Sequence, residues 1–426
     1  MAEMAPLDAD MFWRSRLGAT DQFALYCFAA QGDRRPDELL ADLRLRAGGV
    51  PELGLRAAPA WRDLALPRWC PAPIVDDQLR HHDGPATWDE CRAAVADLLT
   101  DSLDATEHTW RAHLFGPVAG APRAAGPAWV LVLQVSHALA DGRGVAALAR
   151  TLLGPGGEPE PTSGRPVAGD RPGVPALAAG VLGMPLRLAA GLALGTAGWR
   201  RADDTPAPPT MAATTLNRVA GRRRRIDVRV VEADALRIGT ATVTVSVLAR
   251  LAEVLGPYLG IADDALTVEL TVGRAAHGRG RNNFHNVSVR LHPHLDRIDR
   301  ARMIDAQIRA ARVREDAPGR RLERRAADIT PAVLRSLAVR WTPTDVAPAR
   351  VAGAAVVSAV HRGPADLTLG GGAVLFTAGF PALSSAHALS IGVLRLGATA
   401  TLSLTTDPAA VDADCLVSLL VAATDG

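Results

Sequence analysis

Apolar and polar residues follow a strand-then-helix pattern near the middle of the first half of this 426-residue chain. Residues 130–135 form a short, largely β-branched apolar run bounded upstream by Gly and Pro, which predicts a buried strand. Residues 142–153 have the apolar spacing of a helix, with Asp141 as its N-cap and Gly154 just past its end. His137 is therefore expected on a turn between a strand and a helix.

Similar patterns recur along the rest of the chain. Apolar runs and strict alternation predict further strands, and apolar residues at helical spacing predict further helices. The predicted strands cover residues 22–29, 112–115, 226–230, 266–272, 287–291, 351–360, 373–376, 389–394 and 399–405, and the predicted helices cover residues 37–46, 88–99, 233–239, 246–259, 300–314 and 408–423. Because strands alternate with helices in both halves, we expect a two-lobed α/β protein.

A change of composition separates the two halves. Residues 155–210 are rich in Pro, Gly and Ala, which is typical of a connection between domains. The sequence therefore predicts an N-terminal lobe over residues 1–154 and a C-terminal lobe over residues 211–426.

Part of this connection, residues 174–199, is strongly apolar and has Arg187 as its single charged residue. A run of this length is a candidate for a membrane-spanning helix, but Pro175, Pro185 and several glycines argue against one. We expect a connecting helix pair packed against the core. The alternative is peripheral contact with a membrane surface.

Composition and charge exclude several classes of protein. Hydrophobic residues make up 48% and charged residues 22% of the chain, which is typical of a globular protein and not of a disordered one. A net charge of +2 and an aromatic content of 4% argue against a nucleic-acid partner. The four cysteines form no CxxC pair and the N-terminus lacks an apolar core, so we expect a cytoplasmic protein without disulfides.

His137 is the strongest candidate for catalysis in the first half. A neutral imidazole can take a proton from a hydroxyl or amine as it attacks an activated acyl carbon. Taken alone, however, a histidine and an aspartate at this spacing are more often a structural histidine and a helix cap than catalytic residues. Ser136 precedes the histidine directly, so its side chain should point to the opposite face, which argues against a serine hydrolase.

Metal binding is not favoured by the other histidines. His81 and His82 are adjacent, and His292 and His294 flank a proline, but neither pair has helical ligand spacing or a nearby cluster of carboxylates. We therefore expect no metal.

A set of ordered motifs resembles the CoA-dependent acyltransferase superfamily, which includes chloramphenicol acetyltransferase and the condensation domains of peptide synthetases. The stretch from Ser136 to Gly142, SHALADG, resembles the HHxxxDG motif of that superfamily. Its surroundings resemble the bacterial wax ester synthase/diacylglycerol acyltransferase branch. The matching segments are Pro6-Leu7-Asp8, Met11-Phe12-Trp13, Leu103-Asp104, residues 110–114, Thr215-Leu216-Asn217, residues 222–225, Asn282-Asn283, residues 287–291, Val357-Ser358 and Gly363-Pro364.

The resemblance implies a chloramphenicol-acetyltransferase-like fold, in which each lobe is an α/β sandwich and a tunnel runs along their interface. It implies His137 as the general base, with structural support from Asp141, Gly142 and Ser136 and without a covalent acyl-enzyme. Acyl-CoA or an acyl-carrier thioester would be a substrate, and no cofactor would be needed. A carrier protein would be a possible partner.

Less specific matches supply candidate substrate-binding residues. These are Arg274, Asn282, Asn283 and Ser358. A salt bridge between the motif aspartate and an arginine is usual in the superfamily, and Arg274 is the candidate partner of Asp141.

Three departures from the family pattern change the expected function. Ser136 replaces the first motif histidine, Thr244-Val245 replaces an Asn-Asp pair, and Ser358-Ala359 replaces a Ser-Asn pair. We therefore expect acyl transfer to an alcohol or amine in specialised metabolism and not in storage-lipid synthesis. The alternative is a catalytically degenerate member that binds a lipid, a pathway intermediate or a partner protein.

Overall fold

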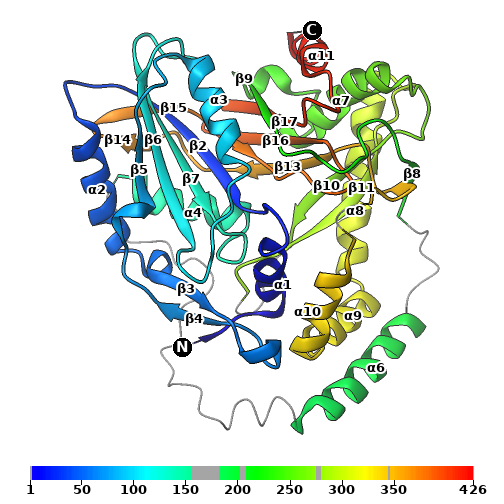
Figure 1. Cartoon of the computed structure of the whole chain (residues 1–426). Coiled ribbons are helices and arrows are strands. Elements are labelled where there is room, and N and C mark those ends of the chain that lie inside the picture. Colours follow the sequence, from blue (N-terminus) through cyan, green and yellow to red (C-terminus); the bar gives the residue numbers. More distant parts are fainter. Residues whose placement is uncertain (1, 156–181, 202–207, 275–279, 344–345, 426) are drawn as a thin grey trace.

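The computed structural model describes residues 2–155, 182–201, 208–274, 280–343 and 346–425. These residues form two lobes that lie side by side, each built on a six-stranded sheet flanked by helices (Figure 1). The expected two-lobed α/β fold is confirmed. Of the predicted connecting helix pair, the part before residue 182 lies outside the described residues.

The first lobe contains a mixed sheet with the strand order β14-β15-β2-β7-β6-β5. All neighbouring strands are antiparallel except β5 and β6, which are parallel. The strands are β2 (Gln22–Ala29), β5 (Leu79–His82), β6 (Trp110–Val118), β7 (Ala128–Val135), β14 (Thr368–Leu369) and β15 (Gly372–Phe380), and the helices are α1 (Pro6–Ser15), α2 (Pro36–Gly48), α3 (Trp88–Leu98) and α4 (Gly142–Leu153).

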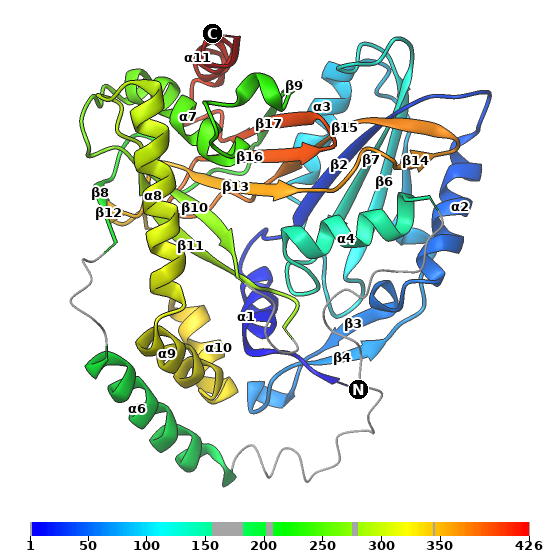
Figure 2. The ribbon, with the colours of Figure 1, turned by 180° about the vertical axis from the view of Figure 1, so that it is seen from behind.

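Both faces of this sheet are buried. On β2, Tyr26 packs into the cluster that includes Leu148 of α4, whereas Leu25 packs into the cluster that includes Val95 of α3. Helices α4 and α3 accordingly lie on opposite sides of the sheet (Figure 2). Because both faces are covered, the strands read as continuous apolar runs.

The second lobe contains a sheet with the order β11-β10-β13-β16-β17-β9. Strand β13 is parallel to both of its neighbours, and the other pairs are antiparallel. The strands are β9 (Arg225–Glu232), β10 (Thr267–Gly273), β11 (Phe284–Arg290), β13 (Val356–His361), β16 (Leu389–Leu396) and β17 (Thr399–Thr406), and the helices are α7 (Val243–Leu259), α8 (Arg297–Glu315), α9 (Pro318–Asp328), α10 (Ala332–Trp341) and α11 (Ala413–Asp425).

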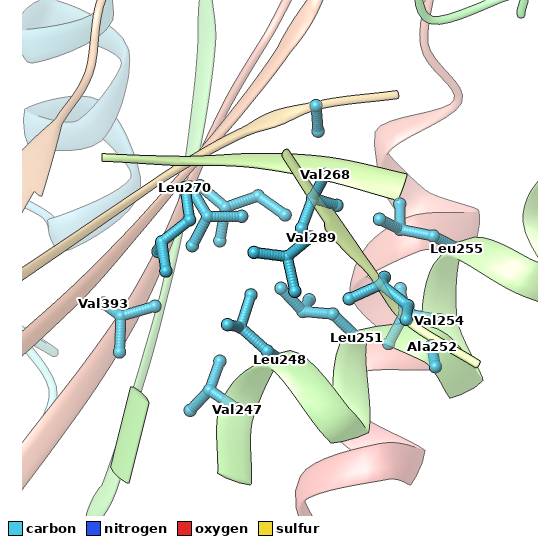
Figure 3. Close-up of a cluster of buried hydrophobic side chains, with 14 of the residues drawn as sticks. Val247, Leu248, Leu251, Ala252, Val254, Leu255, Val268, Leu270, Val289 and Val393 are labelled. Atoms are coloured by element: carbon cyan, nitrogen blue, oxygen red, sulfur yellow. The ribbon is translucent and has the colours of Figure 1, made fainter. Parts of the chain in front are cut away.

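The core of the second lobe forms where α7 packs on this sheet. Leu248 and Leu251 of α7 lie against Leu270 of β10 and Val289 of β11 (Figure 3). Most of the residues between Val243 and Gly256 of α7 are buried, which accounts for its nearly unbroken apolar sequence.

Two strands near the end of the chain return to the first lobe. β15 pairs with β2, and β14 pairs with β15, so the sheet of the first lobe combines residues from both ends of the chain. The two sheets approach closely at this point, where Ser403 Oγ donates a hydrogen bond of 2.5 Å to the carbonyl oxygen of Gly379. A Cβ atom on Gly392 would lie 2.4 Å from the same oxygen, so the approach requires glycine.

Short elements complete the described chain. A three-stranded sheet in the order β1-β4-β3 lies beside α1, and two residues of β8 pair with β12. These strands are β1 (Ala2–Glu3), β3 (Leu55–Ala58), β4 (Arg68–Pro71), β8 (Met211–Ala212) and β12 (Arg350–Val351).

Three predicted elements differ from the structure. The helix expected at residues 233–239 is a single 3-10 turn, Asp234–Leu236, because Arg237 is extended and Gly239 has a φ of 55°. The strand expected at residues 351–360 is divided between β12 and β13. The last helix starts at Ala413 and not near residue 408, since Asp412 accepts a hydrogen bond from the backbone N–H of Cys415 as an N-cap does.

Helix α6 (Met184–Arg200) is the described part of the predicted connection. It packs against α9 at the outer edge of the molecule, and both ribbon views place it away from the two sheets (Figures 1 and 2). Among the described helices, none is long and apolar enough to cross a membrane.

Candidate active site

His137 lies on the turn between β7 and α4, as the sequence predicts. Asp141 closes this turn, because its Oδ1 accepts hydrogen bonds from the backbone N–H groups of Arg143 (3.1 Å) and Gly144 (3.0 Å). These contacts satisfy donors that the first turn of a helix leaves free. His137 remains partly exposed, whereas the residues on both sides of it are buried.

Asn282 holds the imidazole of His137 from the second lobe. The Nδ1 atom of His137 lies 2.9 Å from Oδ1 of Asn282. Nδ2 of Asn282 donates to the carbonyl oxygen of His137 (2.8 Å) and to Oδ1 of Asp8 (2.9 Å). Since both bonds orient the amide, its Oδ1 must accept the Nδ1 proton of His137, and Nε2 is the nitrogen with a free lone pair.

Asp8 of α1 holds Asn282 in place through hydrogen bonds. It is fully buried and accepts hydrogen bonds from the backbone N–H groups of Arg281 (3.0 Å) and Asn282 (2.9 Å) and from the Asn282 side chain. Burial raises the pKa of the Asp8 carboxyl to about 6, although these hydrogen bonds act in the opposite direction. A hydrogen-bonded chain therefore runs from Asp8 through Asn282 to His137.

The surroundings of His137 favour its neutral form. Burial lowers the pKa of the imidazole below its ordinary value, while hydrogen bonds to its own backbone and to Asn282 and the charge of Asp141 act in the opposite direction. The ring of Phe284 lies 5.3 Å from the imidazole, centroid to centroid. A neutral imidazole with a free Nε2 has the state that a general base requires at neutral pH.

Asp141 and Gly142 connect this turn to the second lobe. Oδ2 of Asp141 accepts a hydrogen bond of 3.0 Å from the backbone N–H of Asn283. A Cβ atom on Gly142 would lie 2.9 Å from Cγ2 of Val360 on β13, which is too close for an unstrained contact. The motif aspartate and glycine therefore fix the His137 turn against two segments of the second lobe.

Ser136 makes no hydrogen bond to the imidazole in the part of the chain that the structure describes. The residue is fully buried, and its Oγ has no hydrogen-bond partner among the residues that the structure describes. Its backbone N–H donates to the carbonyl oxygen of Thr109 at 2.8 Å. The arrangement is therefore not that of a serine activated by its neighbouring histidine.

A cavity of about 650 Å³ lies next to Asn282, between α1, the start of β11 and helices α8, α9 and α10. Charged side chains of both signs line it together with small and apolar residues. The charged residues are Arg274, Arg312, Arg324, Arg335, Asp10, Glu315, Asp316 and Asp328. His285 also lines the cavity, and both of its ring nitrogens are buried without a hydrogen-bond partner in the described part of the chain.

Three of the four candidate substrate-binding residues meet at this cavity. Arg274, Asn282 and Asn283 line it, whereas Ser358 lies on β13 beside a much smaller cavity that Gly142 also lines. The suggestion that Arg274 pairs with Asp141 is wrong. Arg274 instead forms an ion pair of 2.8 Å with Glu315 of α8.

The histidines considered for metal binding have a carboxylate beside them that sequence spacing did not reveal. Asp264 lies 2.5 Å from Nδ1 of His292 and 3.4 Å from Nδ1 of His294. However, Gln307 accepts from the backbone N–H of Arg290 through Oε1, so it presents Nε2 to Nε2 of His292 at 3.0 Å. The proton of His292 is then on Nδ1, where it bonds to Asp264. His292 and Asp264 therefore form a structural hydrogen-bonded pair, and we do not assign a metal site to them.

Sequence reasoning missed two contributors to the site. Asp8 stands in a segment that carries the family resemblance, but nothing in the sequence gave it a role beside His137. Phe284 has no sequence signal beyond its place after Asn282-Asn283. Only the tertiary fold brings Phe284 beside the imidazole and Asp8 beside Asn282.

Two lobes that meet at a turn bearing a histidine, followed by a helix-capping aspartate, form the architecture that the resemblance to the CoA-dependent acyltransferase superfamily predicted. Solved structures support this fold. The wax ester synthase/diacylglycerol acyltransferase from Marinobacter aquaeolei VT8 is 17% identical with a TM-score of 0.63, and the match covers 100% of this chain and 98% of that one.

Condensation domains are similar as well. The starter condensation domain of rhizomide synthetase, in complex with C8-CoA and Leu-SNAC, is 13% identical with a TM-score of 0.59, covering 100% of this chain and 93% of that one. The first condensation domain of the calcium-dependent antibiotic synthetase is 16% identical with a TM-score of 0.58, covering 99% and 94%.

Sequence comparison narrows the class to one family. Residues 14–247 match the model of the wax ester synthase/diacylglycerol acyltransferase catalytic domain. The chain belongs to this family, and it is an acyltransferase. No curated protein matches its sequence.

Proposed function

We propose that this protein transfers an acyl group from a CoA or carrier-protein thioester to an alcohol or amine, with Nε2 of His137 as the general base. The observation that carries the proposal is the hydrogen bond between His137 Nδ1 and Asn282 Oδ1. It places the proton on Nδ1 and leaves the lone pair of Nε2 for the acceptor.

In the proposed reaction, Nε2 takes the proton of the acceptor hydroxyl or amine as the acceptor atom attacks the thioester carbonyl carbon. The tetrahedral intermediate then collapses, the C–S bond breaks, and the imidazolium returns the proton to the thiolate. Asn282 accepts from Nδ1 throughout and so holds the ring in place. No acyl group is attached to the protein at any step.

The charged side chains that line the cavity beside Asn282 support an acceptor with a polar body. Arg274 and Arg324 pair with Glu315, and Arg335 pairs with Asp10. An alkyl chain placed in the cavity would still remove water from these charged groups and their neighbours without offering them a hydrogen bond, which is unfavourable. A polar acceptor can satisfy these groups, including the free ring nitrogens of His285.

We therefore assign the protein to specialised metabolism and propose Arg274 and Asn283 as acceptor-binding residues. Asn282 lines the same cavity but bonds to His137 and Asp8, so its proposed role is to position the base, and Ser358 lines the smaller cavity beside Gly142.

A purified sample tests this proposal. Release of free thiol from octanoyl-CoA should require an added acceptor, and amino alcohols should support it better than 1-hexadecanol. Intact-protein mass spectrometry without an acceptor should show no gain of an acyl mass. An acylated protein would contradict the proposed mechanism. A preference for 1-hexadecanol would contradict the proposed class of acceptor.

One observation favours a second function, in which the protein is a catalytically degenerate member of the family that binds a ligand without turnover. Ser136 replaces the first motif histidine, and its buried Oγ has no partner among the described residues. A binding protein should be stabilised thermally by acyl-CoA or by a polar ligand, yet release no thiol with any donor and acceptor. Turnover with any pair of substrates would exclude this alternative.

A further inference from the structure

Helix α6 has an unusual distribution of residues for a helix on the surface of a protein. Leu186, Leu192 and Trp199 are exposed at 76%, 73% and 75% of their surface. A helix of a water-soluble protein normally turns such side chains toward the core. Here the large apolar side chains of the helix point outward.

Glycines make the close contacts of α6 with the protein, and Leu194 and Ala197 are half-buried in the same stretch. A Cβ atom on Gly198 would lie 3.0 Å from the carbonyl oxygen of Gly319 and 3.0 Å from Cγ of Glu323, both on α9. Gly191 and Gly195 also face α9, near Ala326. Small residues at this spacing allow two helices to approach closely. The glycines therefore attach α6 to the protein, and Leu186, Leu192 and Trp199 remain exposed for another contact.

Positive charge predominates around this apolar face, with Glu323 and Asp328 of α9 as the acidic residues nearby. Between Leu182 and Arg201 the charged residues of the sequence are Arg187, Arg200 and Arg201, and all three are exposed. Arg321 and Arg325 of the adjacent α9 are exposed as well. Trp199 next to two arginines is a combination suited to the interface between water and lipid headgroups.

We propose that the outer face of α6, formed by Leu186, Leu192, Trp199, Arg200 and Arg201, docks on an anionic phospholipid surface. The leucines and Trp199 would enter the boundary between headgroups and acyl chains, and the arginines would pair with lipid phosphates. The helix lies flat on the bilayer, because it is too short and too interrupted to span it. An isolated amphipathic helix on a membrane exposes its other side to water. In this protein, α9 covers that side of α6.

This orientation has a consequence for the site. The cavity beside Asn282 is lined by Arg324 and Asp328 of α9, the same helix that carries α6. Docking of α6 would therefore bring the cavity within a short distance of the membrane surface. The docking itself does not depend on acyl transfer.

Vesicle flotation of the full-length protein tests the proposal. The protein should float with vesicles that contain phosphatidylglycerol and much less with vesicles of phosphatidylcholine alone. Changing both Leu186→Asp and Leu192→Asp should lower the bound fraction at least about fivefold. Arg200→Gln with Arg201→Gln should remove most of the preference for phosphatidylglycerol.

The matched control is Leu45→Asp on α2. Leu45 is 81% exposed, and α2 lies far from α6 in both ribbon views. This variant should bind vesicles as the wild type does, and all variants should keep the wild-type melting temperature because the changed side chains are exposed. Failure of the wild type to bind, or equal binding by the Leu186→Asp/Leu192→Asp variant, would overturn the proposal. The proposal would also be overturned if the wild type were a dimer and the Leu186→Asp/Leu192→Asp variant a monomer. In that case a second copy of the protein would cover the outer face of α6.

Discussion

The imidazole of His137 depends on one amide from the other half of the chain. Asn282 contacts His137 at both the Nδ1 atom and the backbone carbonyl, and Asp8 holds Asn282 in turn. Asn282 was expected to bind substrate, yet its three side-chain hydrogen bonds are made within the protein. We therefore regard it mainly as the residue that positions the base.

Removal of this amide should impair catalysis without unfolding the protein. In Asn282→Ala the imidazole can rotate and change tautomer, so kcat should fall about 10- to 100-fold while the KM for acyl-CoA stays within about twofold. Asn286→Ala is the control, since Asn286 is exposed on β11, which follows Asn282, and bonds to Glu269. A kcat of Asn282→Ala equal to that of the control would show that Asn282 does not position His137.

The pH dependence of the reaction should report the base. His137 must be neutral to accept a proton, so activity is present above its pKa and is lost as the pH falls below it. Because burial lowers this pKa, the acid limb of kcat/KM should have its midpoint below the ordinary imidazole value of about 6.5. Protonation of Asp8, with a pKa of about 6, should contribute to the same decline. An acid limb with its midpoint above about pH 7 would contradict the neutral imidazole.

Asp21 should make the protein more stable in mild acid. This carboxyl is buried, accepts hydrogen bonds of 2.8 Å from the Leu103 backbone and the Gln134 side chain, and has a pKa raised by burial to about 6. A raised folded-state pKa gives stability that is complete below the unfolded value of about 4 and is lost as the pH rises through about 6.

Urea unfolding measures this effect. The free energy of unfolding of the wild type, minus that of Asp21→Asn, should be about 1 kcal/mol larger at about pH 5 than at about pH 7.5. A difference that does not change with pH would mean that Asp21 does not titrate in this range.

At the scale of elements, the start of α4 is fixed by its contact with β13. Gly142→Ala places a methyl group 2.9 Å from Cγ2 of Val360, and a β-branched side chain cannot easily move away. The change should lower the free energy of unfolding by about 1–2 kcal/mol. Combination with Val360→Ala should cost less than the sum of the two single changes, because the clash is then gone.

Gly18→Ala provides the control for this experiment, since no atom lies within 4 Å of the added carbon. Thermal or urea unfolding of the four variants gives the comparison. Strict additivity of Gly142→Ala and Val360→Ala would show that the two positions do not touch in solution.

The elements around His137 could be predicted because their signals are local. The apolar run of β7, the spacing of α4 and the capping residue Asp141 all lie within one short segment. Helix α9 gave no comparable signal, since its eleven residues include four arginines and one leucine. Its position is set by the glycine face of α6 and by the bond from Arg324 to Glu315, and neither contact has a pattern in the sequence.

At the scale of the molecule, the order of the chain does not reveal which strands share a sheet. Residues 373–376 were expected as a strand, and the structure extends it to β15 and places it beside β2, about 350 residues earlier in the chain. The site has the same property, because Asn282 lies 145 residues from His137 in the sequence. A resemblance of ordered motifs could indicate that these segments belong together, but only the fold shows which atoms meet.

The central claim is that Nε2 of His137 is the base for acyl transfer. Single-turnover formation of the acylated product from octanoyl-CoA and a polar acceptor, followed by mass spectrometry, tests it most directly in the wild type and in His137→Gln. Glutamine keeps a polar side chain of similar length but cannot act as a base near neutral pH. We predict that the rate falls at least about a hundredfold while the melting temperature is unchanged. A rate for His137→Gln within about twofold of the wild type would contradict this assignment.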